Sequence, residues 1–284
     1  MTPTRPPCVL SIQSEVVYGH VGNGAARFAL QRLGVDVLAL PTVLFSNHPG
    51  HGGVRGRATP AGELAALLEG LAERGFLDGI DAVLSGYLGD PEQAGVVRDA
   101  VVRVKRLNPK ALYLLDPVFG DEGGAYARPG VAEAMARHLL PLADIVTPNR
   151  FELASLTSRR IENEADAAAA ARLLGRPWVA ATSIPVDGLI GTLLVSARTE
   201  TAALIHGERI DHAVSGTGDL FAALLLGRLV RGETFGKAAQ RAIESVTALI
   251  AAARDAGLNE MPLVGRQDWL AEPPSCPGLC TTNA

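Results

Sequence analysis

The sequence predicts an α/β protein, a three-layer α/β/α sandwich in which helices cover both faces of a central, mostly parallel sheet. Two observations support this prediction. Short apolar runs alternate with longer helical patterns along most of the 284 residues, and a β-α order of this kind is typical of parallel sheets. Several runs are continuously apolar rather than alternating, which indicates strands that are buried on both faces.

The expected elements follow one another in regular succession. Strands are expected at Val9–Ile12, Val35–Leu40, Ala82–Ser85, Ala111–Leu115, Ile145–Val146, Trp178–Thr182, Thr192–Val195 and Ala202–Ile205. Helices are expected at Asn23–Leu33, Ala61–Arg74, Pro91–Leu107, Val131–Leu139, Arg150–Leu156, Glu164–Leu174, Asp219–Arg231 and Phe235–Ala256. No strong linker or short repeat divides the chain. We therefore expect one domain over residues 1–284, with a loosely held tail over about 272–284.

Charge and composition argue against several classes of protein. The net charge is −4 at pH 7, so the basic surface of a nucleic-acid-binding protein is not expected. No stretch of 18 apolar residues lacks charges, so no membrane-spanning helix is expected. The three cysteines imply no disulfide framework and no metal site, which fits a protein of the reducing cytoplasm.

The segment Ser215-Gly216-Thr217-Gly218-Asp219 is the strongest candidate for chemistry. Its glycines allow backbone conformations that other residues resist, and the apolar run that follows begins a helix. A helix N-terminus presents unpaired N–H groups and a partial positive charge, which suits phosphate oxygens. Asp219 beside this site can accept the proton of an attacking hydroxyl, but it can equally cap the helix, and the segment alone leaves both interpretations open.

Polar residues and glycines concentrate in the loops that follow the expected strands. In open α/β sheets the ligand site lies outside the carboxyl ends of the strands, so these loops are expected to meet around the glycine-rich segment. The segment lacks the Gly-Lys-Ser/Thr ending of a Walker A loop and the third glycine of a dinucleotide-binding fingerprint.

Taken with other segments, the glycine-rich segment resembles the ribokinase superfamily, and within it the pyridoxal kinases. The matching segments cover about residues 8 to 260, in the order of the family. They are Ser11-Ile12-Gln13-Ser14 and Gly19-His20-Val21-Gly22-Asn23, followed by residues 42–48, 85–89, 116–121 and 147–152. The resemblance implies ATP-dependent phosphorylation of the 5′-hydroxymethyl group of pyridoxal, giving pyridoxal 5′-phosphate. Pyridoxine and pyridoxamine are further candidate substrates.

The resemblance also implies roles on the substrate side. Ser14 is expected to hydrogen-bond the pyridine part of pyridoxal and Thr42 to contact the ring. The residues themselves suggest two more roles. Tyr87, in a glycine-flanked turn, is suited to stack on a flat aromatic substrate or to cover the sheet edge. Tyr126 ends a glycine-rich stretch typical of a mobile cover and is expected to close over the substrate or the phosphate.

At the centre of the site, the resemblance implies that Asp219 receives the proton of the substrate hydroxyl. The amides of Gly216, Thr217 and Gly218 are expected to stabilise the transferring phosphoryl group.

On the nucleotide side, the resemblance places Asp116 and Glu152 near Mg²⁺, with Glu152 acting through water. Asn149 and Glu152 also have the spacing of a capping box, and the two roles are compatible. A monovalent cation such as K⁺ is a further candidate near Thr182 and Ser183. The residues expected to border the nucleotide are Asp116, Asp121, Thr147, Asn149, Glu152, Thr182 and Ser183.

Two other kinds of function remain open. The first is a hydroxymethylpyrimidine kinase or another ribokinase-like small-molecule kinase; the anion-binding turn of the hydroxymethylpyrimidine kinases has a Gly-Thr-Gly-Cys pattern, where this chain has Asp219. A non-catalytic vitamin B6-binding protein is the alternative of another class, because a fold alone does not prove activity. The resemblance further implies a homodimer that acts on small molecules, with no nucleic-acid or membrane partner.

Overall fold

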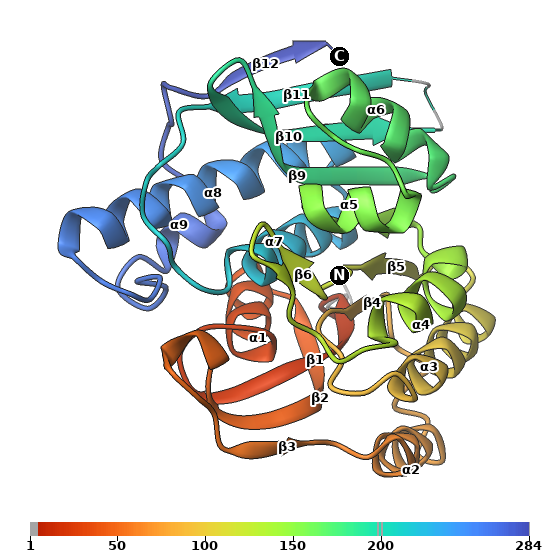
Figure 1. The fold of residues 1–284 in the computed structure, drawn as a ribbon. Helices are drawn as coiled ribbons and strands as arrows, with labels where there is room; N and C mark the ends of the chain where they lie inside the picture. The colour runs from red at the N-terminus through yellow and green to blue at the C-terminus, as the bar shows by residue number, and fades with distance from the viewer. Residues whose placement is uncertain (1–4, 198, 200, 284) are drawn as a thin grey trace.

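A ten-stranded sheet runs through the computed structural model, which describes residues 5–197, 199 and 201–283. The strand order is β12-β11-β10-β9-β8-β5-β4-β1-β2-β3, with β12 at the top of Figure 1 and β3 at the bottom. Neighbouring strands from β2 to β9 pair in parallel, and β3 and the strands from β10 to β12 add antiparallel pairs at the two edges. The mostly parallel sheet predicted from the sequence is confirmed.

The strands of the large sheet are β1 (Cys8–Tyr18), β2 (Asp36–Asn47), β3 (Gly56–Ala58), β4 (Ala82–Ser85), β5 (Leu112–Leu115), β8 (Ile145–Val146), β9 (Trp178–Val186), β10 (Leu189–Ser196), β11 (Thr201–Gly207) and β12 (Cys280–Asn283). A separate small hairpin pairs β6 (Gly120–Asp121) with β7 (Gly124–Ala125).

Helices cover both faces of the sheet, as the three-layer prediction requires (Figure 1). One face is covered by α1 (Asn23–Arg32), α7 (Thr217–Val230), α8 (Phe235–Ala256) and α9 (Asp268–Ala271). The other is covered by α2 (Ala61–Ala72), α3 (Gln93–Leu107), α4 (Val131–His138), α5 (Arg150–Thr157) and α6 (Glu164–Leu173). Within the described residues, none of these helices is long and apolar enough to cross a membrane.

Several elements differ from the sequence-based expectation. Strands β1 and β2 continue well past their expected ends at Ile12 and Leu40, because they pair with each other as far as Tyr18 and Asn47. Polar residues 13–15 of β1 and residues 41–42 of β2 interrupt the apolar runs, although several residues of both extensions, among them Val16 and Val43, are buried. Strands β3, β6, β7 and β12 were not predicted, since none of these short strands contains a continuous apolar run. Strand β12 pairs with β11, so this part of the tail is built into the sheet edge.

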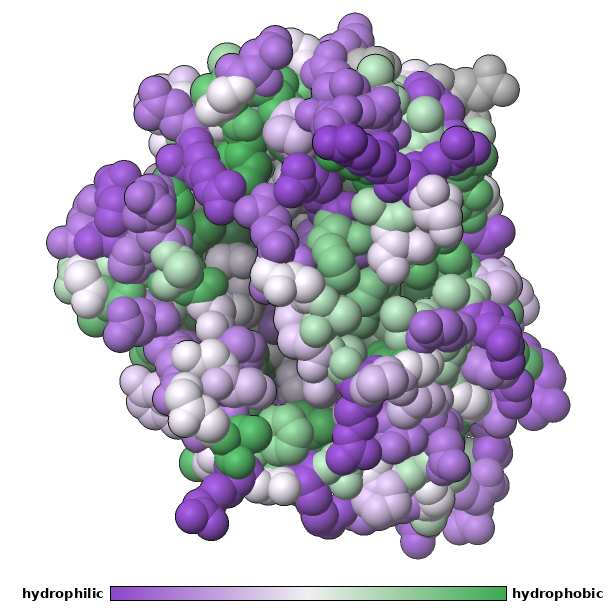
Figure 2. Space-filling model, in the orientation of Figure 1, coloured by the Kyte–Doolittle hydropathy of each residue, from purple (hydrophilic) through white to green (hydrophobic). Residues whose placement is uncertain are grey.

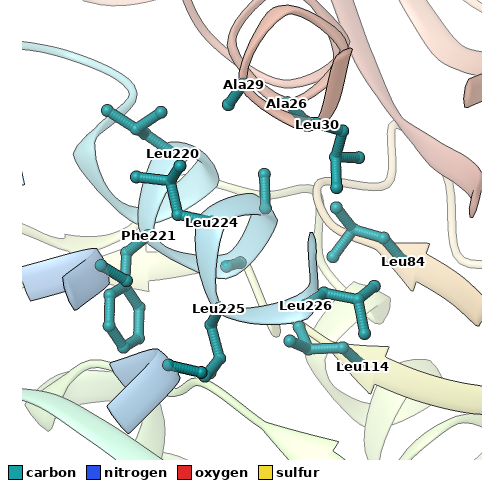
Figure 3. Close-up of a cluster of buried hydrophobic side chains, with 14 of the residues drawn as sticks. Ala26, Ala29, Leu30, Leu84, Leu114, Leu220, Phe221, Leu224, Leu225 and Leu226 are labelled. Atoms are coloured by element: carbon teal, nitrogen blue, oxygen red, sulfur yellow. The ribbon is translucent and has the colours of Figure 1, made fainter. Parts of the chain in front are cut away.

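The core on the α7 face comes from the apolar run that follows the glycine-rich segment. Leu220, Leu224 and Leu226 of α7 are fully buried, and Figure 3 shows them among side chains from α1, β4 and β5. Gly227 lets α1 approach, because a Cβ at this position would lie 2.8 Å from the Cδ1 atom of Leu33. The helix that carries the candidate site is therefore held rigidly against the sheet.

This packing predicts a large loss of stability when Leu224 is truncated. Leu224→Ala should lower the free energy of unfolding by about 2–5 kcal/mol, because it removes buried methyl groups and leaves a cavity. Leu173→Ala is the matched control, since Leu173 is 59% exposed, and its effect should stay within about 0.5 kcal/mol. Urea unfolding of both variants measures the difference, and equal losses would contradict the packing described here.

Candidate active site

The turn that begins α7 forms the floor of the site. Gly216 precedes the first helical residue and has φ +83°, a left-handed conformation that favours glycine. A Cβ at Gly216 would collide with the carbonyl oxygen of His20, so the turn also needs glycine for space. The first intrahelical bond runs from Leu220 N–H to the Gly216 carbonyl, at 2.9 Å. The amides of the first turn are therefore available to an anion.

Asp219 lies in this first turn, but its carboxylate does not cap the helix. Its Oδ2 atom accepts a hydrogen bond of 2.9 Å from the N–H of Gly22, in the loop between β1 and α1. Burial raises the pKa of Asp219, and the Gly22 bond and the nearby His48 offset part of that rise. A carboxylate with a raised pKa beside an anion-binding turn is suited to accept a proton from an attacking hydroxyl.

Asp116 follows β5 and is almost fully buried. Its Oδ1 atom accepts a 2.7 Å hydrogen bond from the Thr147 hydroxyl, whereas its Oδ2 atom is buried without a hydrogen-bond partner among the described residues. Burial, followed by the negative charge of Asp219, raises the pKa of Asp116 to about 7. An unpartnered buried oxygen of this kind has a free lone pair for a cation or a proton.

Glu152 and Asn149 form the capping box that their spacing predicts. The Asn149 side chain accepts from the N–H of Glu152 at 3.0 Å, and Glu152 Oε2 accepts from the N–H of Asn149 at 2.9 Å. Glu152 Oε1 accepts from the N–H of Phe119 at 3.2 Å. Burial and the charge of Asp116 nevertheless raise the pKa of Glu152 well above its usual value. Glu152 therefore lies at the site, with both oxygens held by the backbone.

The side chains present fit an Mg²⁺ ion that has only one or two protein ligands. Among the described residues, no three His, Cys, Asp or Glu side chains converge as a metal-binding group. Mg²⁺ commonly takes one or two carboxylates together with substrate phosphates and water. The free Oδ2 atom of Asp116 fits that role directly, and Glu152 fits it through water.

The nucleotide-side residues come from three neighbouring strand ends. Thr147 follows β8 and binds Asp116, while Thr182 in β9 forms a bridge with Asn149. Ser183 has φ +60°, an unusual conformation for a serine, at the same edge. Asp121 differs from these residues, because it is exposed and its Oδ1 atom accepts from Gly123 N–H within its own hairpin.

On the expected substrate side, the structure gives Thr42 a partner within the protein. Thr42 is fully buried, and its hydroxyl donates to the carbonyl oxygen of Tyr87 at 2.6 Å. Thr42 thus positions the Tyr87 turn, and contact between Thr42 and the ring stays a prediction. Ser14 packs against Gly22, the residue that also binds Asp219.

Tyr126 follows the β6–β7 hairpin, and its N–H donates to the carbonyl of Phe119 at 3.1 Å. Partial burial raises the pKa of its hydroxyl, and the charges of Glu152 and Asp219 raise it further. Figure 2 shows the surface hollowed beside this hairpin, where the loop leading into α7 passes in Figure 1. The hairpin therefore has the position expected of a cover.

Sequence reasoning missed two groups of charged residues around the site. Glu122, at the tip of the hairpin, forms ion pairs with Arg150 (3.5 Å) and with Arg209 (3.6 Å), which lies in the loop leading into α7. Glu260, beyond α8, accepts a hydrogen bond of 2.9 Å from the N–H of His20. These contacts join residues far apart in the chain, so no spacing in the sequence marks them.

Comparisons with known proteins identify relatives that match most of this chain. A family model described as phosphomethylpyrimidine kinase matches residues 65–264. The pyridoxal kinase of Leishmania donovani in complex with ADP and pyridoxamine superimposes with a TM-score of 0.90 at 32% identity, covering 98% of this chain and 99% of that chain. The pyridoxal kinase of Entamoeba histolytica gives a TM-score of 0.91 at 25% identity, covering 98% of this chain and all of that chain.

Curated relatives are more similar still in sequence. Pyridoxal kinase PdxY of Rubrobacter xylanophilus is 43% identical in an alignment 275 positions long that covers 94% of each chain. Pyridoxal kinase PdxY of Deinococcus radiodurans is 41% identical in an alignment 286 positions long that covers 96% of each chain. Because relatives of this similarity match nearly the whole chain, and the fold agrees with theirs, the chain belongs to the pyridoxal kinase family.

Proposed function

We propose that this protein transfers the γ-phosphoryl group of ATP to the 5′-hydroxymethyl oxygen of pyridoxal, with Asp219 as the general base. The observation that carries the proposal is the placement of Asp219. Its carboxylate lies at the anion-binding turn of α7 and accepts a hydrogen bond from the N–H of Gly22, in another loop. It therefore does not cap the helix. The pyridoxal kinases among the relatives support the choice of alcohol.

In the proposed reaction the substrate oxygen attacks the γ-phosphorus in line with the departing ADP. The new O–P bond forms as the bond between the γ-phosphorus and the β,γ-bridging oxygen breaks, and the hydroxyl proton passes to Asp219. Burial favours this transfer, because it raises the proton affinity of Asp219. The amides of Thr217 and Gly218, together with that of Gly216, stabilise the charge on the transferring group.

Pyridoxal is proposed to lie between Ser14, the Tyr87 turn and Tyr126. Ser14 is adjacent to Gly22 and thus to the base, and Thr42 holds the Tyr87 turn through its carbonyl. Tyr126 and its hairpin would then close over the reacting atoms and exclude water, which limits wasteful hydrolysis of ATP.

The nucleotide is proposed to lie along the ends of β5, β8 and β9, with Asp116 as the residue that would hold Mg²⁺. When bound, Mg²⁺ would offset the charge of the phosphates. Arg150 and Arg209 both pair with Glu122 beside the loop into α7, and they would add positive charge at the phosphates once they release Glu122. A monovalent cation near Thr182 and Ser183, a cytoplasmic location and a homodimer remain parts of the proposal that rest on the family resemblance.

Replacement of the base should remove catalysis while preserving binding. Asp219→Asn is expected to lower kcat by at least about 100-fold, because the amide cannot accept the hydroxyl proton. Binding of ATP should remain measurable by calorimetry. Asp211→Asn, an exposed change in the loop before α7, is the control and should keep normal turnover. Wild-type-like turnover by Asp219→Asn would rule out this residue as the base.

A parallel assay distinguishes the candidate alcohols. ADP release is measured with pyridoxal, pyridoxine, pyridoxamine, hydroxymethylpyrimidine and ribose as acceptors. The proposal requires the highest kcat/KM among the B6 vitamers, and a preference for the pyrimidine would favour the alternative kinase.

The raised pKa of Asp116 predicts how the stability of the ligand-free protein varies with pH. Its folded pKa is about 7 against an ordinary value of 3.8, so between these limits the folded state retains a proton that the unfolded chain has released. The free energy of unfolding should therefore fall as pH rises through this window. Asp116→Asn should remove this dependence and make the protein more stable than wild type at pH 8, by about 1–4 kcal/mol.

This advantage of Asp116→Asn should shrink as the pH is lowered toward 4. Urea unfolding between pH 5 and 8, without nucleotide or Mg²⁺, measures it. A stability difference that does not change with pH would show that Asp116 is ionised throughout.

The arginine beside the loop into α7 should affect ATP more than pyridoxal. Arg209→Gln is expected to raise the KM for ATP about threefold to tenfold, a modest effect because the side chain is 64% exposed and its charge is screened. The KM for pyridoxal should not change. Arg160→Gln removes an exposed arginine paired with Glu162 in the loop between α5 and α6, and it should leave both constants unchanged. Equal effects of the two substitutions would argue against a role for Arg209.

A further inference from the structure

Glu260 lies just beyond the C-terminal end of α8, in a segment that its neighbours hold firmly. Met261 and Leu263 follow it and are buried in the same core as α1 and α7. The Glu260 side chain is only 17% exposed. A carboxylate with so little access to water is costly unless other groups hold it, so its contacts indicate what it does.

The first contact is with the loop between β1 and α1. Glu260 Oε2 accepts a hydrogen bond of 2.9 Å from the backbone N–H of His20. Gly19, with φ +102°, makes room for the carboxylate, because a Cβ there would lie 3.1 Å from both of its oxygens. The loop is thus shaped to receive Glu260 at this point.

The same loop contacts the catalytic turn at two places. The carbonyl oxygen of His20, the residue that Glu260 holds by its N–H, faces Gly216 so closely that a Cβ on this glycine has no space. Two residues further along, the N–H of Gly22 donates to Asp219 Oδ2 at 2.9 Å. A shift of His20 would therefore move two groups at once. One is the His20 carbonyl beside Gly216, and the other is the Gly22 N–H that orients the base.

The second contact of Glu260 is with the segment that follows β2. Its Oε1 atom lies 3.2 Å from Nε2 of His51, an ion pair when the imidazole is protonated, and it has no other hydrogen-bond partner among the described residues. His48, in the same segment, has its Nδ1 atom 3.4 Å from the Ser215 hydroxyl. Glu260 consequently links both loops that border the catalytic turn.

We propose that Glu260 is a positioning residue, which holds the Gly19–Gly22 loop so that this loop in turn orients Asp219 and supports the turn at Gly216. Glu260 itself touches neither substrate nor phosphate in this scheme. The inference rests on the proposed role of Asp219 as the base. Its effect should appear in the chemical step, because a reacting group displaced by about 1 Å can cost up to about 100-fold in rate.

The test compares Glu260→Ala, Glu260→Gln and His51→Gln with the control Glu272→Gln, an exposed residue of the same C-terminal region. Glu260→Ala removes both contacts and should lower kcat about 10- to 100-fold, with the KM for ATP within twofold of wild type. Glu260→Gln keeps an oxygen that can accept from His20 N–H, so it should retain most of kcat. His51→Gln loses the ion pair and the ring contacts of His51 with Tyr18 and His48 but keeps the His20 bond, so it should also have a small effect.

A pH profile separates positioning from mere structural support. The Gly22 N–H bond favours the charged form of Asp219, so loosening it should move the acidic limb of kcat/KM to higher pH in Glu260→Ala. Urea unfolding establishes the pH and temperature range in which each variant is folded, and kinetics are measured there. A folded Glu260→Ala with normal kcat and an unmoved acidic limb would overturn the inference. Active Asp219→Asn would instead overturn the proposed base, so the two failures are distinguishable.

Discussion

The withdrawal of neighbouring carboxylates from water is the constraint on which the rest of the site depends. Burial is the largest cause of the raised pKa of Asp116, Glu152 and Asp219. The charge of Asp219 raises the pKa of Asp116 further, and Asp116 does the same to Glu152. Such a cluster costs stability in the empty protein. Cations that enter with the nucleotide would relieve it, so the same feature that weakens the free protein favours binding.

The fold makes this cluster tolerable by surrounding it with backbone amides. Glu152 accepts from the amides of Asn149 and Phe119, and Asp219 accepts from that of Gly22. Two of the carboxylates lie in the first turns of α5 and α7, where the helix dipole favours negative charge. The parallel strands β5 and β8 end beside one another, which brings Asp116 and Thr147 together. Backbone amides and helix dipoles thus stabilise these carboxylates in place of positively charged side chains.

Apolar periodicity predicted the central elements well, because they are buried. Ala82–Ser85, Ile145–Val146 and Phe235–Ala256 were predicted with their observed bounds. The hairpin at residues 120–125 was not predicted, since its two-residue strands depend on backbone pairing and carry no apolar pattern. The outer parts of β1 and β2 were missed because residues 13–15 and 41–42 interrupt the apolar runs, although Val16 and Val43 beyond them are buried.

For the site, the rule that ligands bind at strand ends placed Asp116, Asn149 and Asp219 in one region, and the family resemblance gave them roles. Their side-chain partners could not be predicted in the same way. The Thr42 hydroxyl donates to a carbonyl 45 residues away, and Glu260 accepts from an amide 240 residues away. Contacts of this kind depend on how loops pack in three dimensions, which neither periodicity nor motif spacing encodes.

Gly22 joins the two halves of the proposed chemistry. Its φ is +53°, and a Cβ at this position would overlap the carbonyl oxygen and hydroxyl of Ser14, so no other residue fits without moving β1 at Ser14. Its N–H holds the carboxylate of Asp219 at 2.9 Å. One small residue therefore sets the spacing between the serine expected to bind the pyridine and the proposed base. In-line transfer needs the reacting atoms about 3–3.5 Å apart, so a fixed spacer at this point has a direct catalytic value.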